Sequence, residues 1–285
     1  MMEQLVGLDH VVVVVRDLER AARDWRDLGF TLSPRGTHSA HMGTGNYTIM
    51  FGEDYIELLG VLAPTPHNAP TRDWLARREG IERIAFTTTD AAAGVAELQA
   101  RGVAATGPLD FGRPVELPDG GSTQARFRTF NWPVDEQPGG VRLFACQHLT
   151  RDAVWVPQLQ RHANRATRIG RIELLSRDPS AAAARMARLI DATPTQQDDG
   201  AWRVPTGGAR ADLVFLDRAA LAGRYPGAAV DPLADEGAAA LVLRVADLAR
   251  AREALAAVPA LDSPSGGIVV PAGRASGLML VFEQA

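Results

Sequence analysis

The clearest structural signal in this chain is the segment Gly7-Leu8-Asp9-His10-Val11-Val12-Val13-Val14-Val15-Arg16-Asp17-Leu18-Glu19-Arg20-Ala21. Five consecutive valines predict a buried strand, because β-branched side chains favour strands. An aspartate and a helical segment rich in arginine and alanine follow the strand directly. His10 lies at the start of the strand, so we expect its side chain to face the interior of a sheet.

A second apolar run carries the partner of this histidine. Residues 55–60 form that run, and Glu57 is its only charged residue. Histidine and glutamate are both metal ligands, and each is costly to bury unless it is hydrogen-bonded, paired or bound to an ion. The pair suggests a metal site, although a backbone group or a neighbouring side chain could satisfy either residue alone. Two ligands do not complete a catalytic metal site.

Composition limits the classes of function. With 285 residues, of which 46% are hydrophobic, the chain can bury one large core or two ordinary ones. The net charge of −4 and the pI near 5.9 give no basic footprint, so we expect neither a nucleic-acid nor a membrane partner. All 30 basic residues are arginine, which excludes a Schiff-base lysine and a P-loop lysine.

Cysteine usage and hydropathy predict the compartment. Cys146 is the only cysteine, which excludes intrachain disulfides and multi-cysteine metal sites, and we expect it to be a core residue. Residues 1–30 lack the continuous apolar segment of a signal peptide. The sequence has no uncharged apolar stretch of about 18 residues that could cross a bilayer. We therefore expect a cytoplasmic protein.

The opening pattern occurs four times along the chain. Each copy has an apolar strand, an aspartate and a helix with apolar residues at helical spacing, and the four aspartates are Asp17, Asp90, Asp178 and Asp247. Further strand-like runs follow each helix, at 30–32, 47–51 and 55–59, then 124–130 and 141–146, then 202–205 and 212–216, then 268–271 and 278–282. Every unit therefore reads as a strand, a helix and up to three strands.

Four βαβββ units resemble the vicinal oxygen chelate superfamily of glyoxalases, bleomycin-resistance proteins and extradiol dioxygenases. The run Gly43-Thr44-Gly45-Asn46, residues 54–59 and the run Cys146-Gln147-His148-Leu149-Thr150 are most similar to its glyoxalase-like domain proteins. The resemblance implies an α+β fold in which four βαβββ units pair into two half-open β-cups. It predicts a working cup at 1–150, a linker at 151–167 and a degenerate cup at 168–285.

The resemblance also implies two ligand slots in each unit, one early in the first strand and one early in the fourth. Metalloenzymes of the superfamily fill these slots with His, Glu or Gln, and the metal polarises two vicinal substrate oxygens. The slot residues here are His10 and Glu57, then Arg83 and Leu143 or Phe144, then Arg171 and Asp212, then Ala240 and Leu280. We expect no metal in the second cup, where Arg171 should instead pair with Asp212, because an unpaired buried guanidinium is costly.

Two functions remain open for the first cup. In one, a divalent ion of iron, zinc, manganese or nickel is held by His10, Glu57 and His148, although His148 lies about 13 Å along the strand from Phe144 unless a bulge intervenes. Glu57 and Arg83 would then be catalytic, and Arg83 would bind an anionic group of a small oxygenated substrate, as in a metal-dependent lyase, isomerase or dioxygenase.

In the other function, no metal is bound, Arg83 pairs with Glu57, and the protein binds or sequesters a small anionic molecule. His41 and Asn46 are further candidates for substrate contact, and His38 could reach the mouth of the cup or be solvated. We expect His162 to anchor the linker. The oligomeric state stays open between a monomer and a homodimer.

Overall fold

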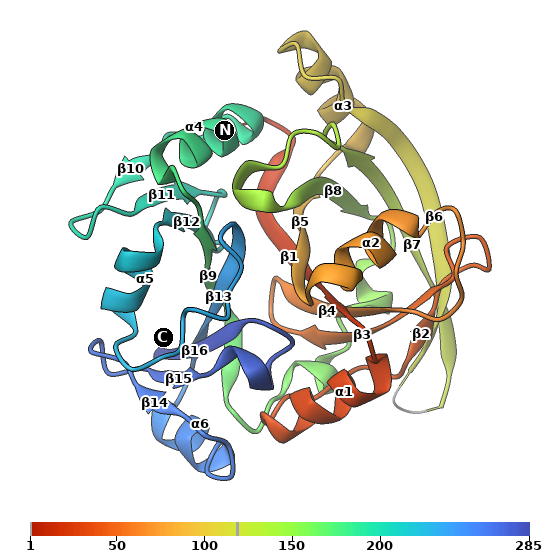
Figure 1. Ribbon diagram of the computed structural model, residues 1–285. Coiled ribbons are helices and arrows are strands. Elements are labelled where there is room, and N and C mark those ends of the chain that lie inside the picture. Colours follow the sequence, from red (N-terminus) through yellow and green to blue (C-terminus); the bar gives the residue numbers. More distant parts are fainter. Residues whose placement is uncertain (1, 118–119) are drawn as a thin grey trace.

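The computed structural model describes residues 2–117 and 120–285, whose strands form two mixed sheets of the same topology (Figure 1). The first sheet has the order β2-β3-β4-β1-β5-β8-β7-β6, and the second has the order β10-β11-β12-β9-β13-β16-β15-β14. Each position in the first sheet has an equivalent in the second. The four-fold repeat in the sequence therefore corresponds to two sheets of βαβββ pairs.

The first sheet takes its strands from the N-terminal half of the chain. They are β1 Leu5–Val15, β2 Gly36–Thr37, β3 Thr44–Met50, β4 Tyr55–Val61, β5 Gly80–Thr88, β6 Thr106–Glu116, β7 Ser122–Asn131 and β8 Arg142–His148. The second sheet is built from β9 Ala166–Leu175, β10 Thr195–Gln196, β11 Trp202–Pro205, β12 Asp212–Leu216, β13 Gly237–Val245, β14 Leu261–Asp262, β15 Ile268–Val270 and β16 Met279–Gln284.

The repeated aspartates start the helices. Asp17, Asp90, Asp178 and Asp247 are N-caps whose carboxylates accept backbone N–H bonds of the first turn. The α-helices are α1 Leu18–Asp27, α2 Ala69–Arg77, α3 Ala91–Ala100, α4 Pro179–Ile190, α5 Arg218–Arg224 and α6 Leu248–Ala254. Short 3-10 turns cover Pro138–Gly140, Arg151–Ala153, Pro157–Gln160 and Ala272–Arg274. None of the helices in the described ranges has the length and hydropathy needed to span a lipid bilayer.

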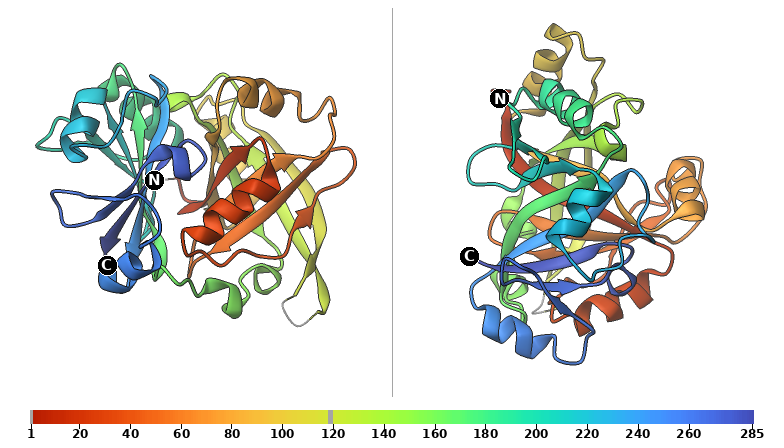
Figure 2. Two further views of the ribbon diagram at one scale, coloured as in Figure 1. Left: turned by 60° about the horizontal axis from the view of Figure 1, so that its bottom comes forward. Right: turned by 60° about the vertical axis from the view of Figure 1, so that its left-hand side comes forward.

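The two faces of each sheet have different tasks, because successive side chains of a strand point to opposite faces. Val11, Val13 and Val15 belong to one large core that also contains Ile172 and Leu174 of the second sheet. Figure 2 shows the two sheets side by side, so this core lies between them. The alternate side chains, such as Val12, face the other way and line the N-terminal cup.

The N-terminal cup is nearly closed into a barrel. Strand β2 lies against β6, so the two edges of the first sheet meet. The predicted linker covers part of the cup, because Val154, Trp155, Val156 and Leu159 pack against Tyr55 and other inner-face residues. Residues 151–160 are therefore part of the wall of the cup as well as a connection.

His162 anchors the linker, as the sequence predicted. Its Nδ1 accepts the N–H of Thr31 at 3.0 Å, and its Nε2 lies 3.0 Å from the carbonyl oxygen of Met50. Burial lowers the pKa of His162 to about 4, although the Met50 contact opposes the change. The imidazole is therefore neutral at physiological pH.

The sequence-based prediction of some secondary-structure elements was wrong. Residues 30–32 are not a strand, and the corresponding edge strand is the two-residue β2. Phe30 and Leu32 are buried in the shared core from a loop, so their apolar pattern reflects packing rather than strand pairing. Strand β6 and helices α2 and α5 were not predicted.

Candidate functional site

Irregular pairing between β1 and β5 positions the polar side chains of the N-terminal cup. The register places His10 opposite Ala85 and Leu8 opposite Phe86, which leaves Asp9 without a cross-strand partner. A second shift leaves Glu82 unpaired between Ile81 and Arg83. β-Bulges of this kind redirect side chains. In both units, a buried carboxylate therefore lies next to the residue that occupies the ligand slot.

Asp9 is completely buried and holds three groups. Its carboxylate lies 2.6 Å from Nδ1 of His10 and 3.0 Å from Nε2 of His148, and it accepts the hydroxyl proton of Thr87 at 2.7 Å. Burial alone would raise the pKa of Asp9, but His148 and His10 outweigh it and hold that pKa well below the usual range. Asp9 is therefore ionised, and it fixes the orientation of His10.

His10 and Glu57 meet on the inner face of the cup. With Nδ1 bound to Asp9, the Nε2 atom of His10 faces the cup and lies 3.9 Å from Oε2 of Glu57. The imidazole stacks on Tyr55 at 4.1 Å and meets the edge of Phe144 at 5.3 Å. The aromatic rings therefore restrict the histidine to one position.

Glu57 is also contacted by an amide and a second histidine. Nδ2 of Asn46 donates to Oε1 of Glu57 at 2.6 Å, and Nε2 of His38 lies 4.0 Å from the same oxygen. Burial would raise the pKa of Glu57, but His10, His38, Asn46 and Arg83 together lower it. Burial lowers the pKa of His38 in spite of the opposing charge of Glu57. The cluster therefore combines an ionised carboxylate with a neutral His38.

Arginines extend the polar surface across the sheet. The register aligns one inner-face row over five strands, consisting of Thr48, Glu57, Val12, Arg83 and Arg142. Glu57 and Arg83 are two strands apart, which corresponds to about 10 Å between their Cα atoms. The pair of Arg83 with Glu57, which belonged to the metal-free alternative, is not formed. Nε of Arg83 instead lies 2.6 Å from Oε2 of Glu82, which also contacts Arg142.

The other predicted site residues lie elsewhere. His148 is not brought to His10 and Glu57 as a third ligand, because its Nε2 faces Asp9. His41 is exposed, and its ring packs against that of His67 at 5.0 Å. In the ranges that the structure describes, no group of three or more His, Cys, Asp or Glu side chains is arranged to hold a metal ion. The side chains as placed therefore do not fit the divalent ion that the resemblance implied.

Three residues of this cup were missed or left undecided by sequence reasoning. Asp9 directly precedes His10, but a carboxylate behind the slot depends on a bulge that no sequence pattern reveals. His38 could not be separated from its exposed neighbour His41. Arg113 acts electrostatically on His38 and Tyr55, although it belongs to β6, which the sequence did not predict.

Comparison with known proteins establishes the family. A model of the glyoxalase-like domain matches residues 8–190. The chain belongs to the glyoxalase-like domain family. No curated protein matches this glyoxalase-like chain in sequence.

Solved structures agree with the family assignment. A hypothetical protein from Staphylococcus aureus superposes with a TM-score of 0.70 and 15% identity, covering 98% of this chain and 99% of its own. A triple mutant of 4-hydroxymandelate synthase from Streptomyces coelicolor gives a TM-score of 0.63 and 15% identity, covering 99% and 93%. At this identity the likeness shows the fold alone, which is the vicinal oxygen chelate fold.

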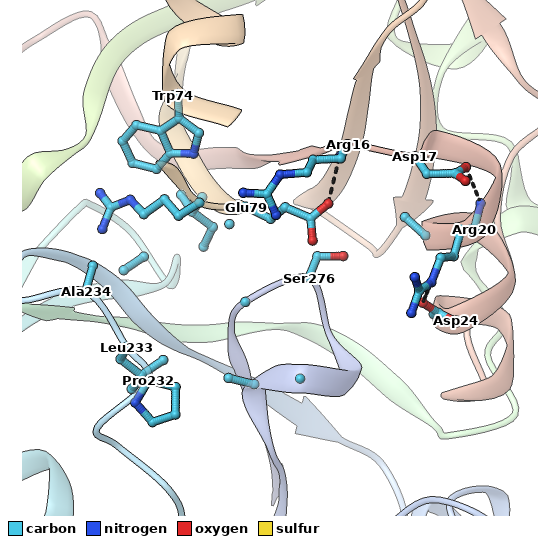
Figure 3. Close-up of a pocket in the computed structure, with 18 residues that line it drawn as sticks. Arg16, Asp17, Arg20, Asp24, Trp74, Glu79, Pro232, Leu233, Ala234 and Ser276 are labelled. Atoms are coloured by element: carbon cyan, nitrogen blue, oxygen red, sulfur yellow. Dashed lines mark hydrogen bonds and ion pairs between the residues drawn. The ribbon is translucent and has the colours of Figure 1, made fainter. Parts of the chain in front are cut away.

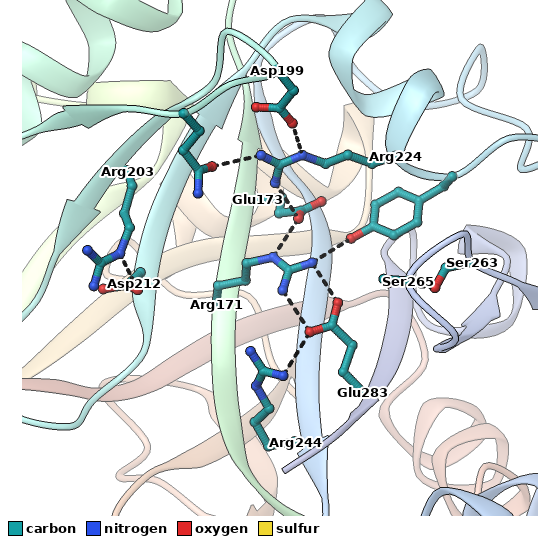
Figure 4. Close-up of polar contacts among 12 residues, drawn as sticks. Arg171, Glu173, Asp199, Arg203, Asp212, Arg224, Arg244, Ser263, Ser265 and Glu283 are labelled. Atoms are coloured by element: carbon teal, nitrogen blue, oxygen red, sulfur yellow. Dashed lines mark hydrogen bonds and ion pairs between the residues drawn. The ribbon is translucent and has the colours of Figure 1, made fainter.

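The C-terminal cup of the glyoxalase-like chain is filled by its own ion pairs (Figure 4). Arg171 donates from Nε to Glu173 at 2.7 Å and from Nη1 and Nη2 to Glu283 at 2.8 and 2.9 Å. Arg224 binds the same Oε1 of Glu173 at 2.8 Å. The expected pair of Arg171 with Asp212 was wrong, because Arg171 reaches across the sheet to Glu283 and Asp212 binds Arg203.

A cavity of about 450 Å³ lies between the two halves of the protein (Figure 3). Its charged side chains already have partners. Oε1 of Glu79 accepts the backbone N–H of Arg16 at 2.6 Å, and Nε of Arg20 lies 3.7 Å from Oδ2 of Asp24. The guanidinium carbon of Arg78 lies 4.0 Å from the centre of the Trp74 ring. The polar cluster around Glu57 is separate from this cavity, and the functional proposal rests on that cluster.

Proposed function

We propose that the N-terminal cup is the active site of an enzyme that transfers a proton on a small anionic carbonyl compound. Glu57 would accept the proton, and Arg83 would stabilise the negative charge that develops on the carbonyl oxygen. The observation that carries this proposal is the ionised Glu57, buried between His10 and His38 and facing the same cup as Arg83. The family supports it only at the level of a glyoxalase-like fold.

The residues divide the chemistry among them. A general base must be ionised, and the contacts that lower the pKa of Glu57 ensure this at neutral pH. A lowered pKa also makes the carboxylate a weak base, so removal of a carbon-bound proton depends on stabilising the product anion. A guanidinium that faces the bound substrate supplies that stabilisation. Asp9 holds His10 against Glu57, so His10 acts as a positioning residue.

A second candidate is binding without turnover. The lowered pKa of Glu57 favours it, because a weak base is a poor catalyst while a cup containing arginines still attracts anions. The divalent ion is not included in either proposal, because the placed side chains do not fit it. Both candidates place the ligand in the N-terminal cup.

Solvent exchange separates the two candidates. The protein is incubated in D2O with a panel of 2-oxo acids, 2-hydroxy acids and α-hydroxyketones, with and without EDTA, and loss of the proton next to the carbonyl or carboxylate carbon is followed by ¹H NMR. The enzyme proposal predicts catalysed exchange for at least one compound, unaffected by EDTA. If compounds bind but none exchanges, the binding proposal replaces it.

A further inference from the structure

A smaller cavity opens beside the polar cluster, where β2 meets β6. We name it the seam cavity. It has a volume of about 160 Å³, and its walls include Pro34, Gly36, Thr48, Arg113, Val154 and Leu159. Thr48 is the cross-strand neighbour of Glu57. The cavity therefore reaches the row of side chains that contains the proposed base.

The guanidinium of Arg113 is a charged group of this cavity that lacks an ion-pair partner among the described residues. Within residues 2–117 and 120–285 the guanidinium of the half-buried Arg113 forms no ion pair or hydrogen bond. The other arginine of the cavity wall, Arg35, lies 3.3 Å from Glu19, and Arg83 lies 2.6 Å from Glu82. A partly buried guanidinium without a carboxylate is costly, so an anionic ligand would satisfy it.

Gly36 explains why Arg113 lies so close to the cluster. A Cβ atom at Gly36 would lie 3.0 Å from Nη1 of Arg113 and 2.3 Å from Oδ1 of Asn46. The missing side chain thus lets Arg113 of the edge strand β6 and Asn46 of β3, the neighbour of the other edge strand, converge. Since Asn46 also donates to Glu57, a short path of polar groups leads from the seam cavity to the proposed base.

We propose that the seam cavity binds the carboxylate of a small 2-oxo or 2-hydroxy monocarboxylic acid through Arg113. The planar guanidinium matches a carboxylate with two parallel hydrogen bonds. The cavity volume equals that of about five water molecules, which is enough for a small carboxylic acid. Val154 and Leu159 provide apolar contacts for the carbon atoms of the acid. Glu116 at the exposed rim disfavours a second carboxylate. This inference names the substrate class of the proposed function and rests on it.

The test uses pyruvate and its uncharged analogue pyruvamide, titrated into the full chain and followed by NMR chemical shifts. We expect wild type to bind pyruvate more tightly than pyruvamide. Arg113→Gln should weaken pyruvate about 10- to 100-fold and leave pyruvamide unchanged, because only the charged hydrogen bonds are lost. Arg113→Lys should recover part of the pyruvate affinity. The matched control is Arg128→Gln on neighbouring β7, whose guanidinium is bound to Asp110 outside the cavity.

The outcomes separate this inference from the proposed function. Equal affinity of wild type and Arg113→Gln for pyruvate, or no preference of wild type for pyruvate over pyruvamide, overturns the inference. Glu57→Gln should still bind pyruvate, since Arg113 is intact. Pyruvate binding that depends on Arg113, with no proton exchange on any compound, supports the inference and overturns the proposed catalysis. If wild type and Arg113→Gln both catalyse proton exchange and bind pyruvate with equal affinity, the proposed catalysis is supported and the inference about Arg113 is overturned.

Discussion

Replacement of Asp9 by asparagine should destabilise the protein and disorder the candidate site together. The carboxylate is completely buried and contacts His10, His148 and Thr87. Breaking a buried ionic contact by removing one partner costs about 3 to 5 kcal/mol, and asparagine keeps one acceptor oxygen, so we expect about 3 kcal/mol. For a chain of 285 residues the entropy of unfolding is about 0.6 kcal/mol/K, so that loss lowers the melting temperature by about 5 °C.

Differential scanning calorimetry at pH 7 measures this change. Asp110→Asn is the matched control, because its carboxylate pairs with Arg128 on the surface and should matter little. The pKa of Asp9 is lowered in the folded state, so its contribution is complete above about pH 4 and is lost as acid protonates it. The acid-induced loss of stability should therefore be smaller in Asp9→Asn. A variant that melts with wild type at pH 7 would refute the role of Asp9.

Three further variants test other parts of the structure. Arg171→Ala removes one ion-pair partner from the buried Glu173 and from the half-buried Glu283, and it should lower the free energy of unfolding by about 3 kcal/mol in urea titrations. In Gly94→Ala the new Cβ would lie 2.5 Å from the ring of Phe130. The cost of overpacking, about 1 to 3 kcal/mol, should exceed the gain of about 1 kcal/mol in helix propensity, so the variant should be less stable than wild type. Gly52→Ala is the control, because a Cβ at Gly52 would have no atom within 4 Å. The pKa of His162 is about 4 when folded, so the unfolded chain binds more protons between about pH 6.5 and 4. His162→Gln should therefore remove about 3 kcal/mol of the stability lost over that range, as measured by pH-dependent melting curves.

The fold could be predicted from sequence because its signals are local and repeated. Each repeat joins an apolar strand to a helix through an aspartate, and that aspartate is an N-cap in all four units. The regions whose secondary structure was not predicted correctly lack such signals. Phe30 and Leu32 are apolar because they pack into the shared core from a loop, so their pattern wrongly predicted a strand. Strand β6 is mostly exposed, so it lacks the alternation of apolar and polar residues that predicts a strand.

The candidate site was predicted only in part. The alternation of strand residues was enough to bring His10 and Glu57 to one cup. Ion-pair partners were not predictable, because they depend on bulges and on long side chains reaching across strands. Glu82 lies in the irregular pairing next to Arg83, so Arg83 pairs with Glu82 and not with Glu57. In the second sheet, Arg171 pairs with Glu283 and not with Asp212.

The most direct test of the account compares proton exchange in Glu57→Gln and Asp212→Asn, using whichever compound wild type exchanges in D2O. Glu57 lies in the N-terminal cup, and Asp212 is a carboxylate of the C-terminal cup outside the network around Arg171. We predict that Glu57→Gln loses at least about 100-fold in the exchange rate, as expected for a general base, while Asp212→Asn stays near wild type. Full exchange activity in Glu57→Gln, with the same fold and melting temperature as wild type, would contradict the account.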